Sequence, residues 1–202
     1  MRTAQSNPVS RTRLLDAAQN LMLKKGFSST SVEEICRAAK LTKGTFFHYF
    51  KSKEQLGKVV LERFCYNSRD MMEKSCCSQD KTTDPLKKVY NHLDLVVKMA
   101  KTPASKGCLL GILTQEMSDT CPSMREVCED GFDEWARIFK KDLDAAKSQY
   151  APRAGFDTQS LAEYFIAVVE GSQILTKAKP SRKFMEKNME HFKEYLKTLF
   201  KK

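Results

Sequence analysis

The sequence predicts an all-α protein of about nine helices, and two observations support this fold class. Apolar residues recur at helical spacing in nearly every segment, and no stretch alternates apolar and polar residues as a half-buried strand does. Helix start and stop signals also divide the chain at short intervals. We therefore expect a small N-terminal helical bundle joined to a larger C-terminal helical region.

The N-terminal bundle is predicted from four helices in about 65 residues with short connections. A helix over residues 10–25 ends at Gly26. The segment Ser31–Glu34 (SVEE) is a capping box that starts a short helix. Thr42 caps another short helix that ends near Phe50.

A second capping box, Ser52-Lys-Glu-Gln55, opens a longer helix that runs to about Lys74 and would link the two parts of the chain. The polar stretch Ser75–Thr83 predicts a loop, and Asp84-Pro85 starts the next helix, which ends at a break over 103–106. Further helices are expected over 107–117, from Pro122 to a break at 150–155, over 158–178, and after Pro180-Ser181 to about residue 199.

Composition and length exclude several protein classes. The chain has 202 residues, 41% of them hydrophobic, which can bury one sizeable core or two small ones. No apolar run approaches the roughly 20 residues of a membrane helix, and no secretory signal is evident, so we expect a cytoplasmic protein without a membrane segment. The seven cysteines are odd in number and lack a C-x-x-C pair, which argues against a disulfide framework and a zinc site. We expect no metal and no cofactor.

Positive charge is concentrated near the N-terminus. The net charge is +10, and residues 1–65 hold 12 basic and 5 acidic side chains, against 23 and 20 in residues 66–202. Between Cys36 and Lys53 there are five basic residues and no acid. This asymmetry favours a polyanionic partner for the N-terminal part, although a solvated basic face is the alternative.

Residues 30–56 have the frame of a helix-turn-helix, in which the second helix enters the major groove of DNA. Small and polar side chains at the start of that helix let the backbone approach base edges, which is one reason to tolerate Gly44. The helix N-termini at Ser31 and Thr42 can donate to phosphates. Ile35, Leu41, Phe46 and Phe50 are expected in the core instead. The candidate DNA-binding residues are Ser31, Thr42, Lys43, Gly44, Thr45, Phe47, His48, Tyr49 and Lys53.

Residues 11–56 resemble the TetR family of transcriptional repressors, above all in the block T-K-G-T-F-F-H-Y-F-K-S-K-E-Q-L. The chain departs from the family pattern at Lys40, where a glycine is usual, and at Phe47, where a tyrosine is usual. The resemblance implies a homodimer with one helix-turn-helix per subunit and an operator of double-stranded DNA. It also implies a DNA-binding domain over 1–52, continuing into a linking helix over 53–74, and an effector-binding and dimerisation domain over 75–202.

A second, shorter resemblance concerns the effector. The segment S-K-G-C-L-L-G, with acidic residues downstream, is similar to a TetR subgroup that responds to N-ethylmaleimide and other electrophiles. A thiol in the first turn of a helix beside Lys106 would be favoured as the reactive thiolate, so Cys108 is a candidate sensor. The resemblance to the subgroup, which also carries a lysine at this place in the penultimate helix, implies Lys177 as its partner. The alternative is that Cys108 is a buried small hydrophobe. Tyr90 and Trp135 are candidate walls of a pocket for a small-molecule effector.

The helix over 158–178 is apolar on almost every side, which is typical of a helix buried in a large core or in a subunit interface. We expect the last two helices to pair with a second copy. The candidate interface residues are Phe165, Val168, Val169, Phe192, Tyr195 and Leu196.

The predicted function is that of a DNA-binding regulator, a repressor that a small-molecule or electrophilic effector releases from its operator. The alternatives are a helical enzyme and a protein-binding module without DNA function. The chain offers little for catalysis, because it has no phosphate-binding glycine loop and no H-E-x-x-H pattern.

Overall fold

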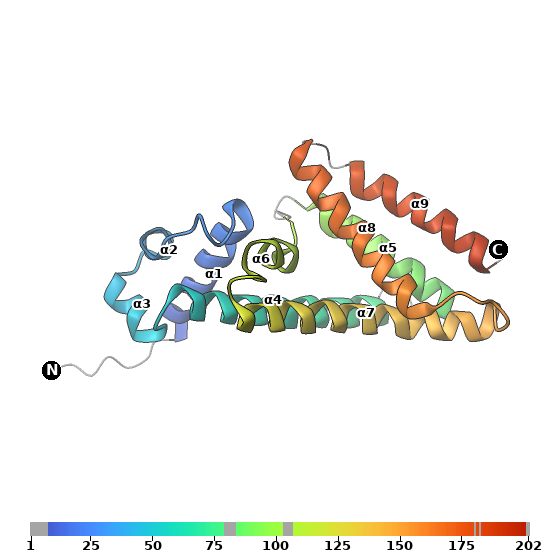
Figure 1. Cartoon of the computed structure of the whole chain (residues 1–202), viewed down its shortest axis with the longest axis horizontal. Coiled ribbons are helices and arrows are strands. Elements are labelled where there is room, and N and C mark those ends of the chain that lie inside the picture. Colours follow the sequence, from blue (N-terminus) through green and yellow to red (C-terminus); the bar gives the residue numbers. More distant parts are fainter. Residues whose placement is uncertain (1–7, 79–83, 103–106, 180, 182, 201–202) are drawn as a thin grey trace. The chain divides into compact units, whose positions relative to one another are not determined.

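The computed structural model describes residues 8–78, 84–102, 107–179, 181 and 183–200, with side chains of 75–78 excepted. Within these residues the chain forms nine α-helices and no strand, which confirms the all-α prediction (Figure 1). The helices are α1 (Pro8–Lys25), α2 (Val32–Ala39), α3 (Lys43–Tyr49), α4 (Lys53–Ser78), α5 (Pro85–Lys101), α6 (Leu109–Met117), α7 (Pro122–Tyr150), α8 (Thr158–Ala178) and α9 (Lys183–Phe200). None of these helices is long and apolar enough to cross a membrane.

Two compact units share the chain. The N-terminal unit consists of the described parts of Met1–Tyr66 and of Cys108–Glu129, so it combines α1, α2, α3 and the start of α4 with α6 and the start of α7. The C-terminal unit consists of the described parts of Asn67–Gly107 and Asp130–Lys202. The helix-turn-helix therefore folds together with α6, which follows it by some 60 positions in the sequence.

Local capping starts the short helices where the sequence predicts. The Ser31 hydroxyl accepts from the Glu34 N–H while the Glu34 carboxylate accepts from the Ser31 N–H, which confirms the capping box. The Thr42 hydroxyl accepts from the Thr45 N–H at the start of α3. Asp84 caps α5, with Pro85 in its first turn.

Two local predictions need correction. The polar segment expected as a loop from residue 75 instead continues α4 to Ser78, because residues 75–78 include neither glycine nor proline, the residues least favourable in a helix. At the start of α4 the Ser52 hydroxyl accepts from the Gln55 N–H, but the Gln55 side chain accepts from the N–H of Lys51, one residue earlier than a capping box requires.

The core of the N-terminal unit joins helices from both of its chain segments. Phe46 and Ile35 are fully buried and anchor the helix-turn-helix from inside. Gly57 of α4 lets Phe27 and Met124 approach closely, since a Cβ there would lie 2.6 Å from the Phe27 ring and 2.8 Å from the Met124 methyl. The backbone of α4 thus packs tightly against the α1–α2 loop and against the first turn of α7.

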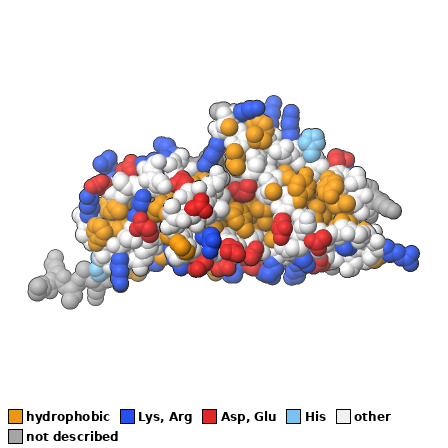
Figure 2. All heavy atoms as spheres, in the orientation of Figure 1, with side chains coloured by type: hydrophobic (Ala, Val, Ile, Leu, Met, Phe, Trp, Pro, Cys, Tyr) orange, Lys and Arg blue, Asp and Glu red, His pale blue; other side chains and the backbone are white. Residues whose placement is uncertain are grey.

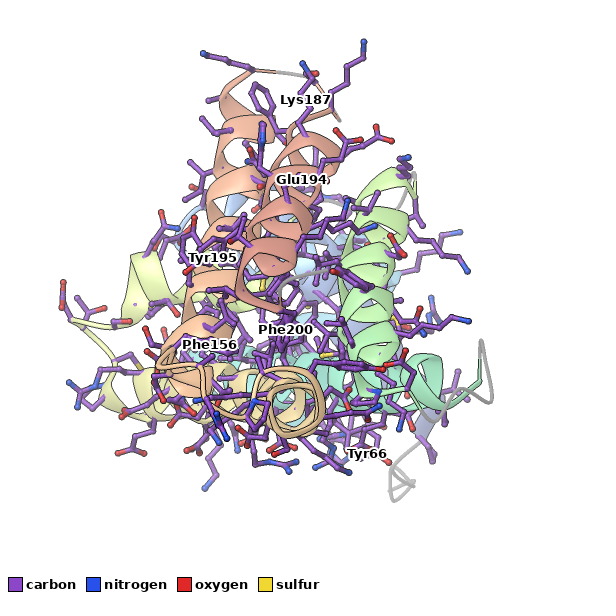
Figure 3. All side chains as sticks on the ribbon, turned by 90° about the vertical axis from the view of Figure 1, so that its right-hand side faces the viewer. Tyr66, Phe156, Lys187, Glu194, Tyr195 and Phe200 are labelled. Atoms are coloured by element: carbon purple, nitrogen blue, oxygen red, sulfur yellow. The ribbon has the colours of Figure 1, made fainter. Side chains whose placement is uncertain are left out.

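An aromatic cluster forms the core of the C-terminal unit. Phe165 of α8 contacts Phe139 of α7, with ring centroids 4.3 Å apart, and Phe192 of α9 at 5.6 Å. α8 and α9 lie side by side (Figure 1), and at one end of the pair the rings of Phe156 and Phe200 meet at 5.4 Å (Figure 3). Tight aromatic packing fixes which faces of α8 and α9 point inward.

Candidate functional site

Backbone hydrogen bonds close the turn between α2 and α3, and one residue of the turn adopts a left-handed conformation. Lys40 ends α2 in the left-handed conformation (φ 53°, ψ 47°), and its N–H donates to the Arg37 carbonyl. The Leu41 N–H donates to the Cys36 carbonyl, which closes the turn. Lys40 stands where the family pattern has glycine, so a side chain occupies a backbone conformation that costs an L-residue about 1–2 kcal/mol.

The start of α3 presents small polar groups at the surface. The Thr42 and Thr45 hydroxyls lie 2.9 Å apart, and Thr42, Lys43 and Gly44 are exposed. A Cβ on Gly44 would meet only Thr42 Oγ1, at 3.7 Å, which is ordinary contact. The fold itself therefore does not require glycine at this position, and a close approach from outside remains a reason for it.

Aromatic and imidazole rings extend this surface along α3. Phe46 is buried, and the adjacent Phe47 ring, 56% exposed, packs edge-on against it at 5.2 Å. His48 is exposed and lies 4.8 Å from the half-buried Tyr49 ring. The buried ring fixes the rotation of α3, so the predicted contact residues Lys43, Phe47 and His48 reach solvent.

Lys43 is engaged by a carboxylate of the neighbouring helix. Its ammonium forms an ion pair with Glu33 in the first turn of α2, and both side chains are more than half exposed. The hydrogen bond from Lys43, and then its charge, lower the pKa of Glu33. The sequence does not reveal this pair, because ten positions separate the two residues and no helical periodicity links them.

The adjacent carboxylate supports the fold. Glu34 accepts from Lys25 Nζ at 2.6 Å as well as from the Ser31 N–H and hydroxyl. These donors, that of Lys25 foremost, lower the pKa of Glu34 to about 2. Because Glu34 completes the Ser31 cap, the α2 N-terminus that was predicted to face phosphate is already partly satisfied by the protein itself.

Lys53, another predicted DNA contact, binds the protein's own backbone. Its ammonium donates to the Phe27 carbonyl at 3.1 Å and lies 4.3 Å from the centre of the Phe27 ring. Lys53 thus ties the start of α4 to the α1–α2 loop, and its side chain is only half-buried.

A carboxylate of α6 holds the same loop and was not predicted from the sequence. Glu116 Oε2 accepts from the Ser28 N–H at 2.8 Å. Its carboxylate fills the space beside Gly26, which has a positive φ of 86° and where a Cβ would overlap Glu116. Thr30, fully buried, closes the loop by donating to the Gly26 carbonyl at 2.7 Å.

The predicted sensor thiol lies at the very start of α6. Cys108 is the N-cap residue, half-buried, and its side chain makes no capping hydrogen bond. Lys177 packs near Gly107, with its Nζ 3.6 Å from where a Cβ would be. Cys108 and Lys177 belong to different units, so their pairing stays a prediction. Lys106 and the side chains of Cys76 and Cys77 lie outside the described residues.

Two other thiols, Cys36 and Cys128, are buried in the core, and the predicted pocket residues are at least half-buried. Burial raises the pKa values of Cys36 and Cys128, which makes them poor nucleophiles. Trp135 is 8% exposed and packs edge-on against Phe165, so most of its surface belongs to the core. Tyr90 is half-buried, and burial raises its pKa.

The predicted dimer residues divide into two groups. Phe165, Val169, Phe192 and Leu196 are at most 2% exposed and lie in the core of the single chain. Of the six, therefore, a partner could contact chiefly Val168 and Tyr195. An interface pattern could not be separated from a core pattern on helices that are apolar on several sides.

A groove between α8 and α9 contains three of the predicted interface residues, Val168, Phe192 and Tyr195, together with Tyr164, which was not predicted from the sequence. Tyr164 and Tyr195, 52% and 43% exposed, stand with their rings 6.0 Å apart beside it (Figure 3 labels Tyr195). Figure 2 shows hydrophobic side chains gathered over these two helices. The groove is lined by Tyr164, Val168, Gly171, Ser172, Leu175, Asn188, His191, Phe192 and Tyr195.

Comparison with curated proteins gives relatives over most of the chain. The HTH-type transcriptional repressor DhaR of Mycobacterium sp. is 25% identical over 94% of this chain and 90% of its own length. The HTH-type transcriptional repressor NemR of Escherichia coli is 24% identical over 93% of this chain and 94% of its own. These relatives are regulators of transcription and not enzymes.

Solved structures share the fold. A regulatory protein TetR from Rhodobacter sphaeroides superposes with a TM-score of 0.80 at 26% identity, over 91% of this chain and 97% of that one. The reduced form of E. coli NemR superposes with a TM-score of 0.78 at 22% identity, over 94% and 97%. The all-α architecture is thus shared over nearly the full length of each chain.

Two family models match the two parts of the chain. Residues 14–59 match the model of bacterial regulatory proteins, tetR family, and residues 85–192 match the tetracyclin repressor-like C-terminal domain. The first match covers the α2–α3 surface, and the second covers α8 and the part of α9 up to residue 192. The chain therefore belongs to the TetR family of DNA-binding transcriptional regulators.

Proposed function

We propose that this protein is a cytoplasmic repressor that binds a double-stranded DNA operator as a homodimer and leaves it when an effector binds. Residues 1–52 form the DNA-binding domain, 53–74 the linking helix and 75–202 the effector-binding and dimerisation domain. For the effector to release the protein, it must bind the DNA-free state more tightly, and the coupling is reciprocal.

One observation carries the DNA-binding assignment. The start of α3 offers exposed Thr42, Lys43 and Gly44, and the fold leaves room for a Cβ at Gly44. A glycine that the protein's own packing does not need, at the N-terminus of a helix flanked by Lys43 and His48, suits close approach to a groove and its phosphates. The excess of basic residues in 1–65 has the sign that DNA requires.

Fluorescence anisotropy with a DNA fragment from upstream of the protein's own gene tests the assignment. We expect affinity that falls steeply with salt, and a loss of roughly 10- to 100-fold in the Lys43→Ala, His48→Ala double variant. Lys187→Ala, a surface lysine of α9, is the matched control and should bind as the parent does. Equal binding by the double variant would overturn the α3 interface.

The homodimer is supported by the groove between α8 and α9. Tyr164, Leu175 and Tyr195 leave large apolar surfaces exposed there, while Asn188 and His191 provide polar groups at its border. A two-fold interface presents the same patch from both subunits, so an apolar patch can cover itself. Of the residues predicted from the sequence, Val168, Tyr195 and the nearly buried Phe192 line this groove.

Sedimentation analysis of two neighbouring variants tests the dimer. We expect Leu175→Glu to dissociate it, because a carboxylate in an apolar interface is desolvated without a partner. Ile174→Glu places the same charge on an exposed side chain of α8 that does not line the groove, and should dissociate the dimer far less. Equal sedimentation of the parent and Leu175→Glu would place the interface elsewhere.

The effector is proposed to be an electrophile that modifies Cys108, or a small molecule that binds near Tyr90 and Trp135. Support for the thiol comes from its place at the N-cap of α6, where the helix dipole favours a negative group. Operator release by N-ethylmaleimide should be lost in Cys108→Ser and kept in Cys121→Ser, a control thiol that directly precedes α7. Equal release by Cys108→Ser would show that another thiol reacts and would overturn Cys108 as the sensor.

A further inference from the structure

The ion pair between Glu33 and Lys43 places a fixed anion inside the proposed DNA surface. Residues 36–53 contain five basic residues and no acid, so Glu33 and Glu34 are the carboxylates nearest to this stretch on its N-terminal side. Both lie in the first turn of α2, and each binds a lysine. The pair joins the first turns of α2 and α3, which are the two helices of the proposed interface.

Only one of the two carboxylates is needed for the fold. Glu34 completes the cap of α2 and binds Lys25, so its position follows from local structure. Glu33 lies one residue earlier, takes no part in the Ser31 cap, and is 60% exposed. Helix capping therefore does not explain why a carboxylate faces Lys43.

We propose that Glu33 is a specificity-determining residue that competes with DNA phosphate for Lys43 and so weakens binding to DNA other than the operator. This inference rests on the proposed DNA-binding function. In the free protein the Lys43 ammonium is held by Glu33 of α2. A phosphate must displace that carboxylate, and the displaced carboxylate then lies close to the phosphate and repels it.

The competition acts unequally on different DNA sequences. Binding to an arbitrary sequence depends almost entirely on phosphate contacts, so it bears the full effect of losing Lys43 to Glu33. At the operator α3 enters the major groove, where Lys43 binds an uncharged base edge that Glu33 does not repel as it repels a phosphate, so the cost is smaller and does not cancel in the specificity ratio. Exposed ion pairs are weak, so DNA can displace Glu33 from Lys43. The free-energy cost of this displacement is small in each subunit, but in a dimer it counts twice, which is enough to change the ratio of operator binding to non-specific binding.

Titration of four proteins with a DNA duplex of arbitrary sequence tests the proposal. The proteins are the parent, Glu33→Gln, Lys43→Met and the Glu33→Gln, Lys43→Met double variant. We expect Glu33→Gln to bind about 3- to 10-fold more tightly at low salt, with a salt slope steeper by about 0.9 per subunit. The gain should vanish in the Lys43→Met background, and it should be smaller with the DNA from upstream of the gene.

Glu62→Gln is the matched control, because it removes one exposed carboxylate of α4 in the same unit. A gain in Glu62→Gln equal to that in Glu33→Gln would reduce the effect to net charge and overturn the proposal. Weaker binding by Glu33→Gln, unchanged binding, or a gain that persists without Lys43 would overturn it as well. If the parent itself lacks salt-dependent DNA binding, the proposed function fails together with the inference.

Discussion

The Glu116 carboxylate in α6 accepts a hydrogen bond of 2.8 Å from the Ser28 N–H in the loop between α1 and α2. The two residues are 88 positions apart in the sequence, yet they belong to one compact unit. The same carboxylate fills the space that Gly26 leaves open. The helix α6, which Cys108 precedes as N-cap, therefore directly contacts the loop that leads into the helix-turn-helix.

Removing this contact should destabilise the N-terminal unit. Glu116→Ala leaves the Ser28 N–H without its acceptor and opens a gap beside Gly26, which should lower the free energy of unfolding by about 1–2 kcal/mol. Glu116→Gln, whose amide oxygen can still accept, should cost less than half as much. Urea unfolding followed by circular dichroism measures both, and equal losses in the two variants would contradict a specific hydrogen bond.

Replacing Lys40 by glycine should stabilise the N-terminal unit. Lys40→Gly relieves a left-handed backbone conformation that an L side chain adopts at a cost, so we expect the free energy of unfolding to rise by about 1 kcal/mol. Ala38→Gly places a glycine at a helical position in the last turn of α2 and should lower it by about 0.5–1 kcal/mol. If thermal unfolding shows both glycines destabilising, the Lys40 conformation does not store the expected strain.

Gly44→Ala should separate stability from DNA binding. Its Cβ would make only ordinary contact with Thr42 Oγ1, so folded stability should rise by about 0.5–1 kcal/mol. A methyl group on the surface that enters the major groove of DNA should nevertheless weaken DNA binding by roughly tenfold, about 1.4 kcal/mol. Gly155→Ala, where a Cβ meets nothing within 4 Å, should leave DNA affinity unchanged. Unaltered affinity of Gly44→Ala would remove close approach as its role.

Acid should weaken the helix-turn-helix through Glu34. Its pKa in the folded protein is about 2, against an ordinary value of 4.5, so the unfolded chain takes up a proton first as pH falls. The resulting stability is fully present above about pH 4.5 and is lost as pH falls toward 2. In Glu34→Gln, which can keep the cap but has no charge, thermal stability should depend less on pH over this range. An identical pH profile would rule out this linkage.

The DNA-binding part of the fold was predictable because its signals are local. The caps at Ser31 and Thr42 bind N–H groups three residues away, and the burial of Ile35, Phe46 and Phe50 follows from helical spacing. Such interactions need only the conformation of one turn of chain. The same range of sequence supplied the family resemblance.

Contacts between distant segments were not predictable, and they changed the meaning of several residues. Lys53 binds the Phe27 carbonyl, Lys43 pairs with Glu33, and Glu116 reaches Ser28, each through packing that no local pattern encodes. On α8 the sequence could not tell Phe165, which is buried, from Tyr164, which is exposed, because most faces of that helix are apolar.

The sequence by itself therefore determined the helices, the caps at Ser31, Thr42 and Asp84, the basic N-terminal part and the surface of α3. The tertiary structure alone decided which lysines are held by the protein and which apolar side chains of α8 and α9 remain for a partner. The physical reason is range: propensity and capping act within three or four residues, whereas burial and ion pairing depend on how helices far apart in the chain are packed together.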